Sequence, residues 1–352
     1  MCPAEYKIRF GCFLPVPATP VDKLFKIAKM NEEAGFDSIW FPDHLLFIPP
    51  GIVPEAWTML AATATLTSNA LLGTCVSDPH RYNPAVLAQK AATVDQISGG
   101  RVILGLGAGE AMNLEPFGID WSKPVSKLVE AVKIMRRLWA GEVLNYDGEF
   151  WRFKDAFLQI TPVKGKIPIY FGANSPRTLR LTGELADGWL PIPFPPRLYG
   201  ERLKFVKEGA EKAGRSISEI DIGIHLYTCV AEKAEDAYKR IESIKAQIIP
   251  SPELLVEAGY NVDLPEDLRS ISFFKALADP AWAEKFLAYG ELIPNEAAIE
   301  FSVAGTVDDC IEKISEYVKI GARHILLINA GPDPRYVLKV YSEKIIPYFK
   351  SG

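Results

Sequence analysis

The amino-acid sequence predicts an α/β protein built as a (β/α)8 TIM barrel with insertions. Eight short apolar segments alternate with amphipathic, helix-forming segments along the 352 residues, and this alternation indicates parallel strands joined by helices. The apolar segments are hydrophobic at odd and even positions alike, as in strands that are buried on both faces. Eight such units close into a barrel, although a doubly wound open sheet shows the same alternation. We expect one domain over residues 1–352.

In the first half of the chain, strands and helices alternate regularly. The first strand, 8–14, is followed by a helix over 21–35 in which apolar residues recur at helical spacing and which ends at Gly35. The next three strands are expected at 38–44, 71–76 and 102–107, and the helices after them at 57–67, 84–97 and 125–139.

A polar stretch with aromatic residues, 145–160, leads into the second half. Its strands are expected at 167–172, 187–191, 220–230 and 324–328, and its helices at 177–185, 198–213, 307–320 and 336–346. Helix-forming sequence from 234 to about 287 exceeds what one connection needs. We therefore expect a helical insertion at about 242–295, which is a candidate lid over the site.

The composition points to a small-molecule partner. The net charge of −5 and the pI near 5.6 provide no basic field of the kind that nucleic acids attract. The five cysteines form no C-x-x-C pair, which argues against a zinc knuckle, a redox dithiol or a disulfide framework. We find neither a secretory leader nor an uncharged run near 18 residues. We expect a cytoplasmic protein without a membrane partner.

Polar residues and glycines follow five of the expected strands. Because the active sites of such barrels are built from the carboxyl ends of the strands, these positions are the first place to search. They comprise Asp43 and His44; Cys75, Val76, Ser77 and Asp78; Gly107, Ala108, Gly109, Glu110 and Asn113; Gly172, Ala173, Asn174 and Ser175; and Trp189.

Asp43 and His44 close the second strand. Neighbouring residues of a strand point to opposite faces, so we expect these two to have separate roles. A neutral imidazole can take or give a proton near pH 7. The alternative is that Asp43 caps a turn and His44 is a core residue with its hydrogen bonds satisfied.

The glycine-rich segment 104–110 resembles a dinucleotide-binding loop only superficially. No acidic residue ends a strand about 20 residues later, as the Rossmann pattern requires. We interpret the glycines as backbone that lets a flat ring approach, with Glu110 projecting toward it. The alternative for Glu110 is a carboxylate in the first turn of a helix, where the helix dipole favours it.

Segment 172–178 joins a strand to a helix whose first N–H groups could bind phosphate. Ordinary capping by Asn174 or Ser175 is the alternative. His80, His225 and His324 are isolated and receive no role, and no histidine–carboxylate motif indicates a metal site. Cys75 has no base in its sequence surroundings, so a small buried hydrophobic residue is favoured over a nucleophile.

Several motifs together resemble the bacterial luciferase-like superfamily, and within it the branch that uses coenzyme F420, a 5-deazaflavin. They are Phe36-Asp37-Ser38, Asp43-His44, Arg81-Tyr82-Asn83-Pro84-Ala85, Gly100-Arg101 and the run from Gly107 to Asn113. The resemblance covers nearly the whole chain. It implies a barrel with insertions, a homodimer, and a non-proline cis peptide bond at Cys75–Val76.

The resemblance also implies roles for site residues. His44 would transfer a proton beside the hydride-accepting carbon, and Glu110 would be its acid/base counterpart. Asp43 and Asn113 would contact the ring system, and Ala108 and Gly109 would offer backbone to it. The cofactor-binding residues implied in this way are Asp43, Cys75, Val76, Asp78, Ala108, Gly109, Asn113, Asn174, Ser175, Arg177 and Thr178.

The predicted function is hydride transfer between coenzyme F420 and an organic substrate, either a methylenetetrahydromethanopterin-like pterin or a secondary alcohol or ketone. Sugar-phosphate dehydrogenases of this branch have an aromatic residue and a lysine where this chain has Ile48 and the apolar run 191–196, which indicates a less charged substrate. Two alternatives remain: an FMN-dependent luciferase-like monooxygenase, and a non-catalytic flavin- or deazaflavin-binding protein.

Overall fold

The computed structural model describes residues 7–14, 19–46, 53–269, 280–331 and 333–350. Eight of its strands form the barrel, and each lies within one of the expected apolar segments or extends at most one residue beyond it. They are β1 (Arg9–Phe13), β2 (Ser38–Phe41), β3 (Leu71–Thr74), β4 (Val102–Leu106), β7 (Ile169–Phe171), β8 (Gly188–Trp189), β9 (Asp221–Val230) and β11 (His324–Asn329).

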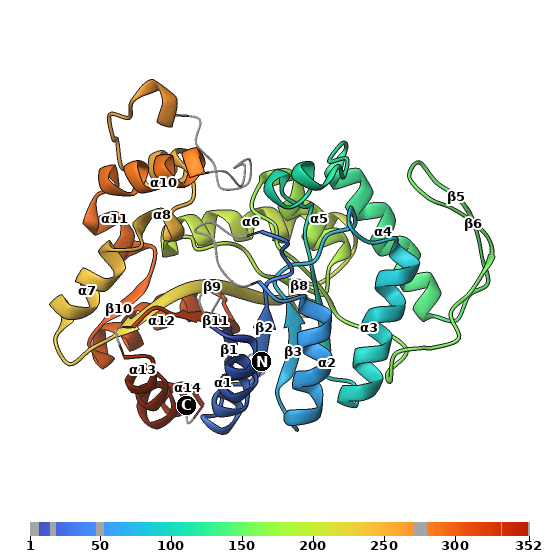
Figure 1. Cartoon of the computed structure of the whole chain (residues 1–352), viewed down its shortest axis with the longest axis horizontal. Helices are drawn as coiled ribbons and strands as arrows, with labels where there is room; N and C mark the ends of the chain where they lie inside the picture. Colours follow the sequence, from blue (N-terminus) through green and yellow to red (C-terminus); the bar gives the residue numbers. More distant parts are fainter. Residues whose placement is uncertain (1–6, 15–18, 47–52, 270–279, 332, 351–352) are drawn as a thin grey trace.

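These strands form a closed, parallel sheet (Figure 1). The order is β9-β11-β1-β2-β3-β4-β7-β8, and β8 pairs again with β9 through Gly188–Asp221 and Trp189–Ile222. That pairing closes the barrel and confirms the predicted (β/α)8 architecture over an open sheet.

Helices surround the barrel and, apart from α14 (Ile346–Lys350), begin close to the expected positions; α14 continues the expected helix 336–346 to residue 350. The others are α1 (Val21–Glu33), α2 (Ala56–Leu66), α3 (Pro84–Ser98), α4 (Pro124–Trp139), α5 (Pro176–Leu185), α6 (Pro196–Lys212), α7 (Ala234–Glu242), α12 (Val307–Ile320) and α13 (Pro334–Val340). Local sequence explains several ends. Asn83 caps α3, which ends at Gly99 in the left-handed conformation, and Thr306 and Asp309 form a capping box on α12.

The barrel lumen is closed at the amino-terminal end of the strands by a buried polar network. Asp221 accepts hydrogen bonds from Arg9 and Tyr170, and its carboxylate lies 3.3 Å from Nδ1 of His324. Nε2 of His324 lies 2.7 Å from the hydroxyl of Ser38. Because both ring nitrogens of His324 have partners, we interpret it as a structural residue. The network closes this end of the lumen, so a site can form only at the opposite end.

Three strands were not expected from the sequence. The polar stretch 145–160 forms an antiparallel ribbon of β5 (Leu144–Asp147) and β6 (Arg152–Ala156), which projects beside α4 in Figure 1. β10 (Val303–Gly305) pairs with the carboxyl end of β9. The ribbon is largely exposed and β10 has only three residues, so neither has the apolar pattern by which strands are recognised.

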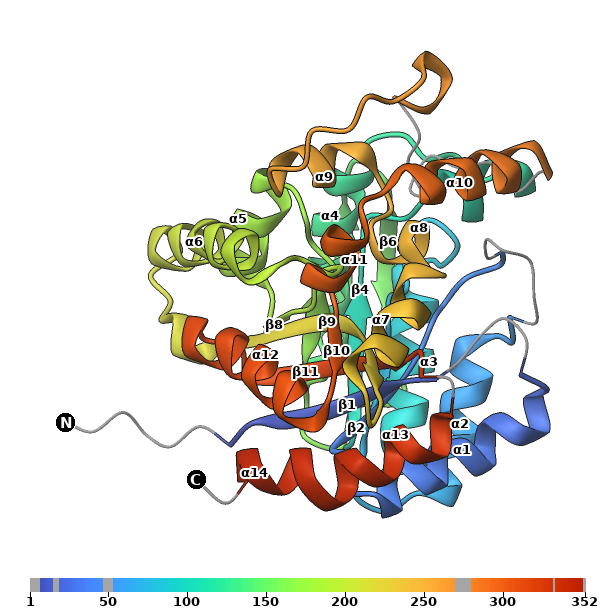
Figure 2. The same cartoon turned by 90° about the vertical axis from the view of Figure 1, so that its left-hand side faces the viewer.

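The described part of the expected insertion is mainly helical, with a non-helical stretch at 258–265. It contains α8 (Lys245–Ile248), α9 (Pro252–Glu257), α10 (Pro280–Leu292) and α11 (Asn295–Glu300). Figure 2 shows α9 and α10 at the end of the molecule opposite to α14. Among the described residues, no helix has the length and apolar character needed to cross a lipid bilayer.

Candidate active site

His44 and Glu110 face each other at the carboxyl-terminal end of the barrel. His44 follows β2 and Glu110 follows β4, and Nε2 of the imidazole lies 3.6 Å from Oε2 of the carboxylate. Both side chains are mostly buried, with exposures of 13% and 20%. The structure thus brings together the two residues that the sequence assigned to catalysis, and the pair can share or relay a proton.

Asn113 holds this pair in place. Its amide nitrogen donates a hydrogen bond of 3.0 Å to Oε2 of Glu110, and its carbonyl oxygen accepts bonds from the backbone N–H groups of Leu45 and Leu46. One buried side chain therefore connects the loop that carries His44 to the loop that carries Glu110. A contact between Asn113 and a cofactor ring stays a prediction.

Asp43 points away from His44, into a buried ion network. Its Oδ1 accepts a 3.0 Å bond from Nη1 of Arg81, and its Oδ2 accepts a bond from the hydroxyl of Ser77. Nε of Arg81 lies 2.6 Å from Asp78, which also accepts bonds from the backbone N–H groups of residues 80 and 81. Arg81 thus bridges two carboxylates. Asp43 and Asp78 are only 2% and 4% exposed, so their predicted contacts with a cofactor stay predictions.

Burial and charge oppose each other in this network. Burial raises the pKa of Asp43, and the Arg81 guanidinium and the Ser77 hydroxyl offset part of that effect. Burial lowers the pKa of Arg81, but its two carboxylate partners outweigh burial and raise it. The guanidinium therefore stays charged at every physiological pH, and it fixes the end of β2 immediately before His44.

The peptide bond between Cys75 and Val76 is cis, as the resemblance implied. The side chain of Val76 occupies space that three glycines on neighbouring strands leave open. A Cβ atom on Gly107 would lie 2.7 Å from Cγ2 of Val76, and one on Gly105 or Gly172 would lie 3.2 Å from a Val76 methyl. The glycines in and after β4 and β7 therefore make room for the Val76 side chain. The predicted approach of a flat cofactor ring would be a second reason for glycine at these positions.

The Cys75 thiol is not activated. Burial, together with the nearby Glu110 carboxylate, raises its pKa to about 12. A protonated thiol is a poor nucleophile, which supports the interpretation of Cys75 as a small hydrophobic residue.

The segment Ala108–Gly109 is anchored from outside the barrel. The carbonyl oxygen of Ala108 accepts a bond of 3.0 Å from Nε1 of Trp121 and lies 3.1 Å from Nε2 of His80. Gly109 has φ = +80°, a conformation that strains residues with a side chain. Both residues remain partly exposed. The loop before Glu110 is thus held rigidly, with part of its backbone accessible.

At the start of α5, the capping interactions proposed as an alternative are present. Ser175 and Thr178 form a capping box, and Oδ1 of Asn174 accepts a 3.2 Å bond from the N–H of Ile192. These bonds use the side chains but leave Ser175 exposed and Asn174 and Thr178 partly exposed at the helix start. Binding of a phosphate group there stays a prediction.

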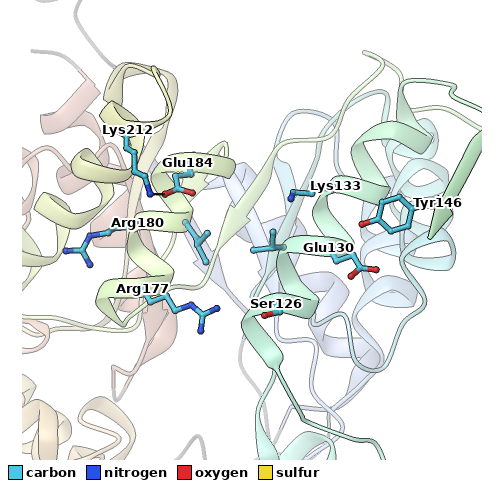
Figure 3. A pocket seen from close by; sticks show the side chains of 10 residues that line it. Ser126, Glu130, Lys133, Tyr146, Arg177, Arg180, Glu184 and Lys212 are labelled. Atoms are coloured by element: carbon cyan, nitrogen blue, oxygen red, sulfur yellow. Dashed lines mark ion pairs between the residues drawn. The ribbon is translucent and has the colours of Figure 1, made fainter. Parts of the chain in front are cut away.

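Arg177 lines a cleft between α4 and α5 with a volume of about 600 Å3. Figure 3 shows Arg177, Arg180 and Glu184 on one side and Ser126, Glu130 and Lys133 on the other. The Glu130 carboxylate accepts hydrogen bonds from the backbone N–H groups of residues 149–151. Arg180 forms an ion pair with Glu208, and Glu184 forms one with Lys212. Within the described part of the chain, Arg177 and Lys133 have no ion pair, so the cleft has uncompensated positive charge.

Most of the chain matches one known protein family. Residues 8–324 match the luciferase-like monooxygenase family. The chain belongs to this family. The matched residues make up about nine-tenths of the chain, and they include the barrel strands up to the start of β11, the cis peptide bond, His44 and Glu110.

Three relatives with 31–32% identity are named as a reductase, a dehydrogenase and a ketoreductase, and the name of the dehydrogenase specifies F420. The 5,10-methylenetetrahydromethanopterin reductase of Archaeoglobus fulgidus is 32% identical over 338 residues, which cover 95% of this chain and 98% of the relative. The F420-dependent glucose-6-phosphate dehydrogenase of Microbacterium testaceum is 31% identical, with 97% of each chain covered. A phthiodiolone/phenolphthiodiolone dimycocerosates ketoreductase of Mycobacterium bovis is 32% identical, with 84% of each covered.

Solved structures of the family have the same fold. An F420-dependent secondary alcohol dehydrogenase bound to an F420–acetone adduct superimposes with a TM-score of 0.83 at 27% identity, over 97% of this chain and 99% of that one. The coenzyme F420-dependent tetrahydromethanopterin reductase of Methanopyrus kandleri gives 0.83 at 25% identity, over 98% and 100%. An FMN-bound Baeyer–Villiger monooxygenase of Pseudomonas putida, at 19% identity, shares the fold alone.

Sequence reasoning missed the residues that connect loops. Arg81 was noted only as part of a family motif, yet it is the centre of the ion network. The spacing of Asp78 and Arg81 is the one local signal that could have indicated their pairing. The contacts of Arg81 with Asp43 and of Asn113 with residues 45 and 46 join distant segments, which no local pattern reveals. Among the described residues, no group of histidine, cysteine, aspartate and glutamate side chains could hold a metal ion. Ile48 lies outside the described residues.

Proposed function

We propose that this protein is an F420-dependent oxidoreductase that transfers a hydride between the deazaflavin and an uncharged organic substrate. The observation that carries the proposal is the His44–Glu110 pair, 3.6 Å apart at the carboxyl end of the barrel. Support comes from relatives that cover nearly the whole chain and whose names specify F420.

The residues present fit an elongated coenzyme with a flat ring at one end and an anionic group at the other. The partly exposed residues Val76, Ala108, Gly109 and Gly172 follow strands that are adjacent in the sheet order β3-β4-β7. The exposed start of α5 follows β7 directly. The ring would lie beside His44 and Glu110, and the anionic end would reach the amino terminus of α5, where N–H groups favour it.

When bound, the coenzyme supplies or accepts the hydride. His44 moves the accompanying proton: its Nε2 takes the proton from a substrate hydroxyl during oxidation, or gives it to the forming alkoxide during reduction. Glu110 stabilises the imidazolium that arises and connects it to other proton acceptors. Asn113 keeps the two groups aligned. Proton transfer of this kind contributes about 10²- to 10⁴-fold to the rate, and positioning of the reacting groups contributes the rest.

The surroundings favour a substrate without phosphate. The segment 191–196 after β8 is apolar, and Leu190 and Phe194 are buried. A secondary alcohol, a ketone or a pterin with a reactive methylene group suits such surroundings better than a sugar phosphate, because a phosphate dianion needs cationic partners to offset its desolvation.

Titrations with each cofactor separate this proposal from its alternatives. Purified protein is titrated with F420 and with FMN while absorption and fluorescence are followed, and oxidation of reduced F420 is then measured with methylenetetrahydromethanopterin and a panel of ketones. We expect saturable F420 binding and turnover with at least one compound. Preferential FMN binding with oxygen consumption would instead identify a monooxygenase, and F420 binding without turnover a carrier protein.

A further inference from the structure

Strand β9 directs two aromatic, polar side chains into the barrel lumen. The alternate residues Ile224 and Leu226 belong to the core between sheet and helices, so His225 and Tyr227 face the interior. The centroid of the His225 ring lies 5.1 Å from that of Phe13 and 6.4 Å from that of Tyr227, with interplanar angles of 34° and 24°. The three rings form an aromatic cluster inside the barrel.

This cluster lies toward the end of the lumen where the active site is. Phe13 is in register with Ile328, and Ile328 with Tyr227. Leu326, two residues before Ile328 and in register with His225, has no exposed surface, whereas His225, Tyr227 and Ile328 are all partly exposed. Because the opposite end is closed by the Asp221 network, solvent reaches these side chains from the carboxyl-terminal end.

Cys75 connects the aromatic cluster to the catalytic pair. It packs against the group of lumen residues that contains Phe13. Burial raises the pKa of the Cys75 thiol, and the negative charge of the nearby Glu110 carboxylate adds to that effect. A substrate held beside His44 and Glu110 would therefore extend toward the aromatic cluster.

His225 has hydrogen-bonding capacity that the protein does not use. Its Nε2 is buried and has no hydrogen-bond partner in the described part of the chain. Burial lowers the pKa of His225 to about 4, so the ring is neutral at pH 7 and has one donor and one acceptor nitrogen. A buried polar atom without a partner is costly, and a ligand that supplies the missing partner recovers that cost.

We propose that His225 is a specificity-determining residue that hydrogen bonds to an uncharged carbonyl, hydroxyl or amide group of the organic substrate, next to the rings of Phe13 and Tyr227. The inference rests on the proposed function and names the group that recognises the substrate. The partly exposed lumen side chains at positions 75, 225, 227 and 328 carry no positive charge at pH 7. An anionic substituent would meet no counter-ion there.

Two variants test the role. His225→Phe keeps a flat ring but removes both nitrogens, and His225→Gln keeps a donor and an acceptor. Tyr348→Phe, at an exposed position in α14, is the control. Each protein is checked for folding by circular dichroism and for F420 binding by fluorescence, and steady-state kinetics are then measured with the most active compound of the ketone and alcohol panel.

We expect KM to rise about tenfold in His225→Phe with kcat within about twofold, because the lost hydrogen bond acts equally on bound substrate and transition state. His225→Gln should recover part of the affinity, and the control should match the wild type. An unchanged KM in His225→Phe overturns the inference. F420 binding and turnover by the wild type show separately whether the proposed function holds.

Nuclear magnetic resonance provides a second readout that needs no turnover. The chain has four histidines, so protein labelled with [13Cε1]histidine gives four signals, and the signal absent from His225→Phe identifies His225. Acetone, cyclohexanone and 2-propanol are titrated with and without F420. A saturable shift of the His225 signal with at least one compound supports the inference, and a signal that none of them moves contradicts it.

Discussion

The amide nitrogen of Asn113 donates a 3.0 Å hydrogen bond to Oε2 of Glu110. The same side chain accepts bonds from the backbone that follows His44. Asn113 therefore connects the two residues proposed to be catalytic, and we expect its loss to affect the reaction more than it affects cofactor binding.

Asn113→Ala should lower kcat about tenfold, because both loops lose their common anchor, while the Kd for F420 stays within about threefold. Asn113→Asp should behave similarly, since it keeps the two accepted bonds but places a second carboxylate against Glu110. Steady-state kinetics and fluorescence titration measure the two quantities. A Kd that rises more than kcat falls would identify Asn113 as a cofactor contact instead.

Replacement of Arg81 should destabilise the protein strongly. Arg81→Met leaves Asp43 and Asp78 buried without their shared cation, and the free energy of unfolding should fall by about 3–5 kcal/mol. Arg152→Met is the matched control, because Arg152 pairs with Asp147 at 82% exposure on both sides, and its effect should stay within about 0.5 kcal/mol. Urea unfolding at pH 7 measures both. Equal effects would show that the buried network is not stabilising.

His225 should make stability depend on pH. Its pKa of about 4 in the folded protein lies below the value near 6.5 of an unfolded chain, so the unfolded state binds more protons between these limits and stability falls as pH falls. From pH 7 to pH 5 the expected loss from this residue is about 2 kcal/mol. Urea unfolding of the wild type and of His225→Phe at both pH values should show a smaller loss in the variant. Equal losses would contradict a depressed pKa.

Arg177 should contribute to binding of the anionic end of the coenzyme. Arg177→Gln should raise the Kd for F420 about fivefold at low salt, and the difference should shrink as salt screens the charge. Arg180→Gln, in the same cleft but already paired with Glu208, should change the Kd less than twofold. Fluorescence titration at two salt concentrations measures both. If the two variants raise the Kd for F420 equally, the total charge of the cleft affects binding, and Arg177 has no specific contact with the coenzyme.

The order and type of the barrel elements could be predicted because each strand and helix has its own apolar pattern. β9 is an example: it was expected at 220–230 and spans Asp221–Val230. The β5–β6 ribbon could not be predicted in the same way. Its side chains are largely exposed, so its pairing rests on backbone hydrogen bonds that leave little trace in the sequence.

The proximity of His44 and Glu110 could be predicted because each follows a strand, and parallel strands end at one edge. The contacts that hold them could not. Arg81 reaches Asp43 across 38 positions, and Asn113 reaches Leu45 across 68. His225 received no role from the sequence, because its significance lies in the rings beside it and in its unused nitrogen.

The most direct test of the account is the turnover of His44→Ala in reduced-F420 oxidation, measured with the coenzyme Kd on the same preparation. If His44 transfers the proton, kcat falls about 100-fold or more while the Kd for F420 stays within about threefold of the wild type. A folded His44→Ala protein that binds F420 and keeps the wild-type kcat would contradict the central claim.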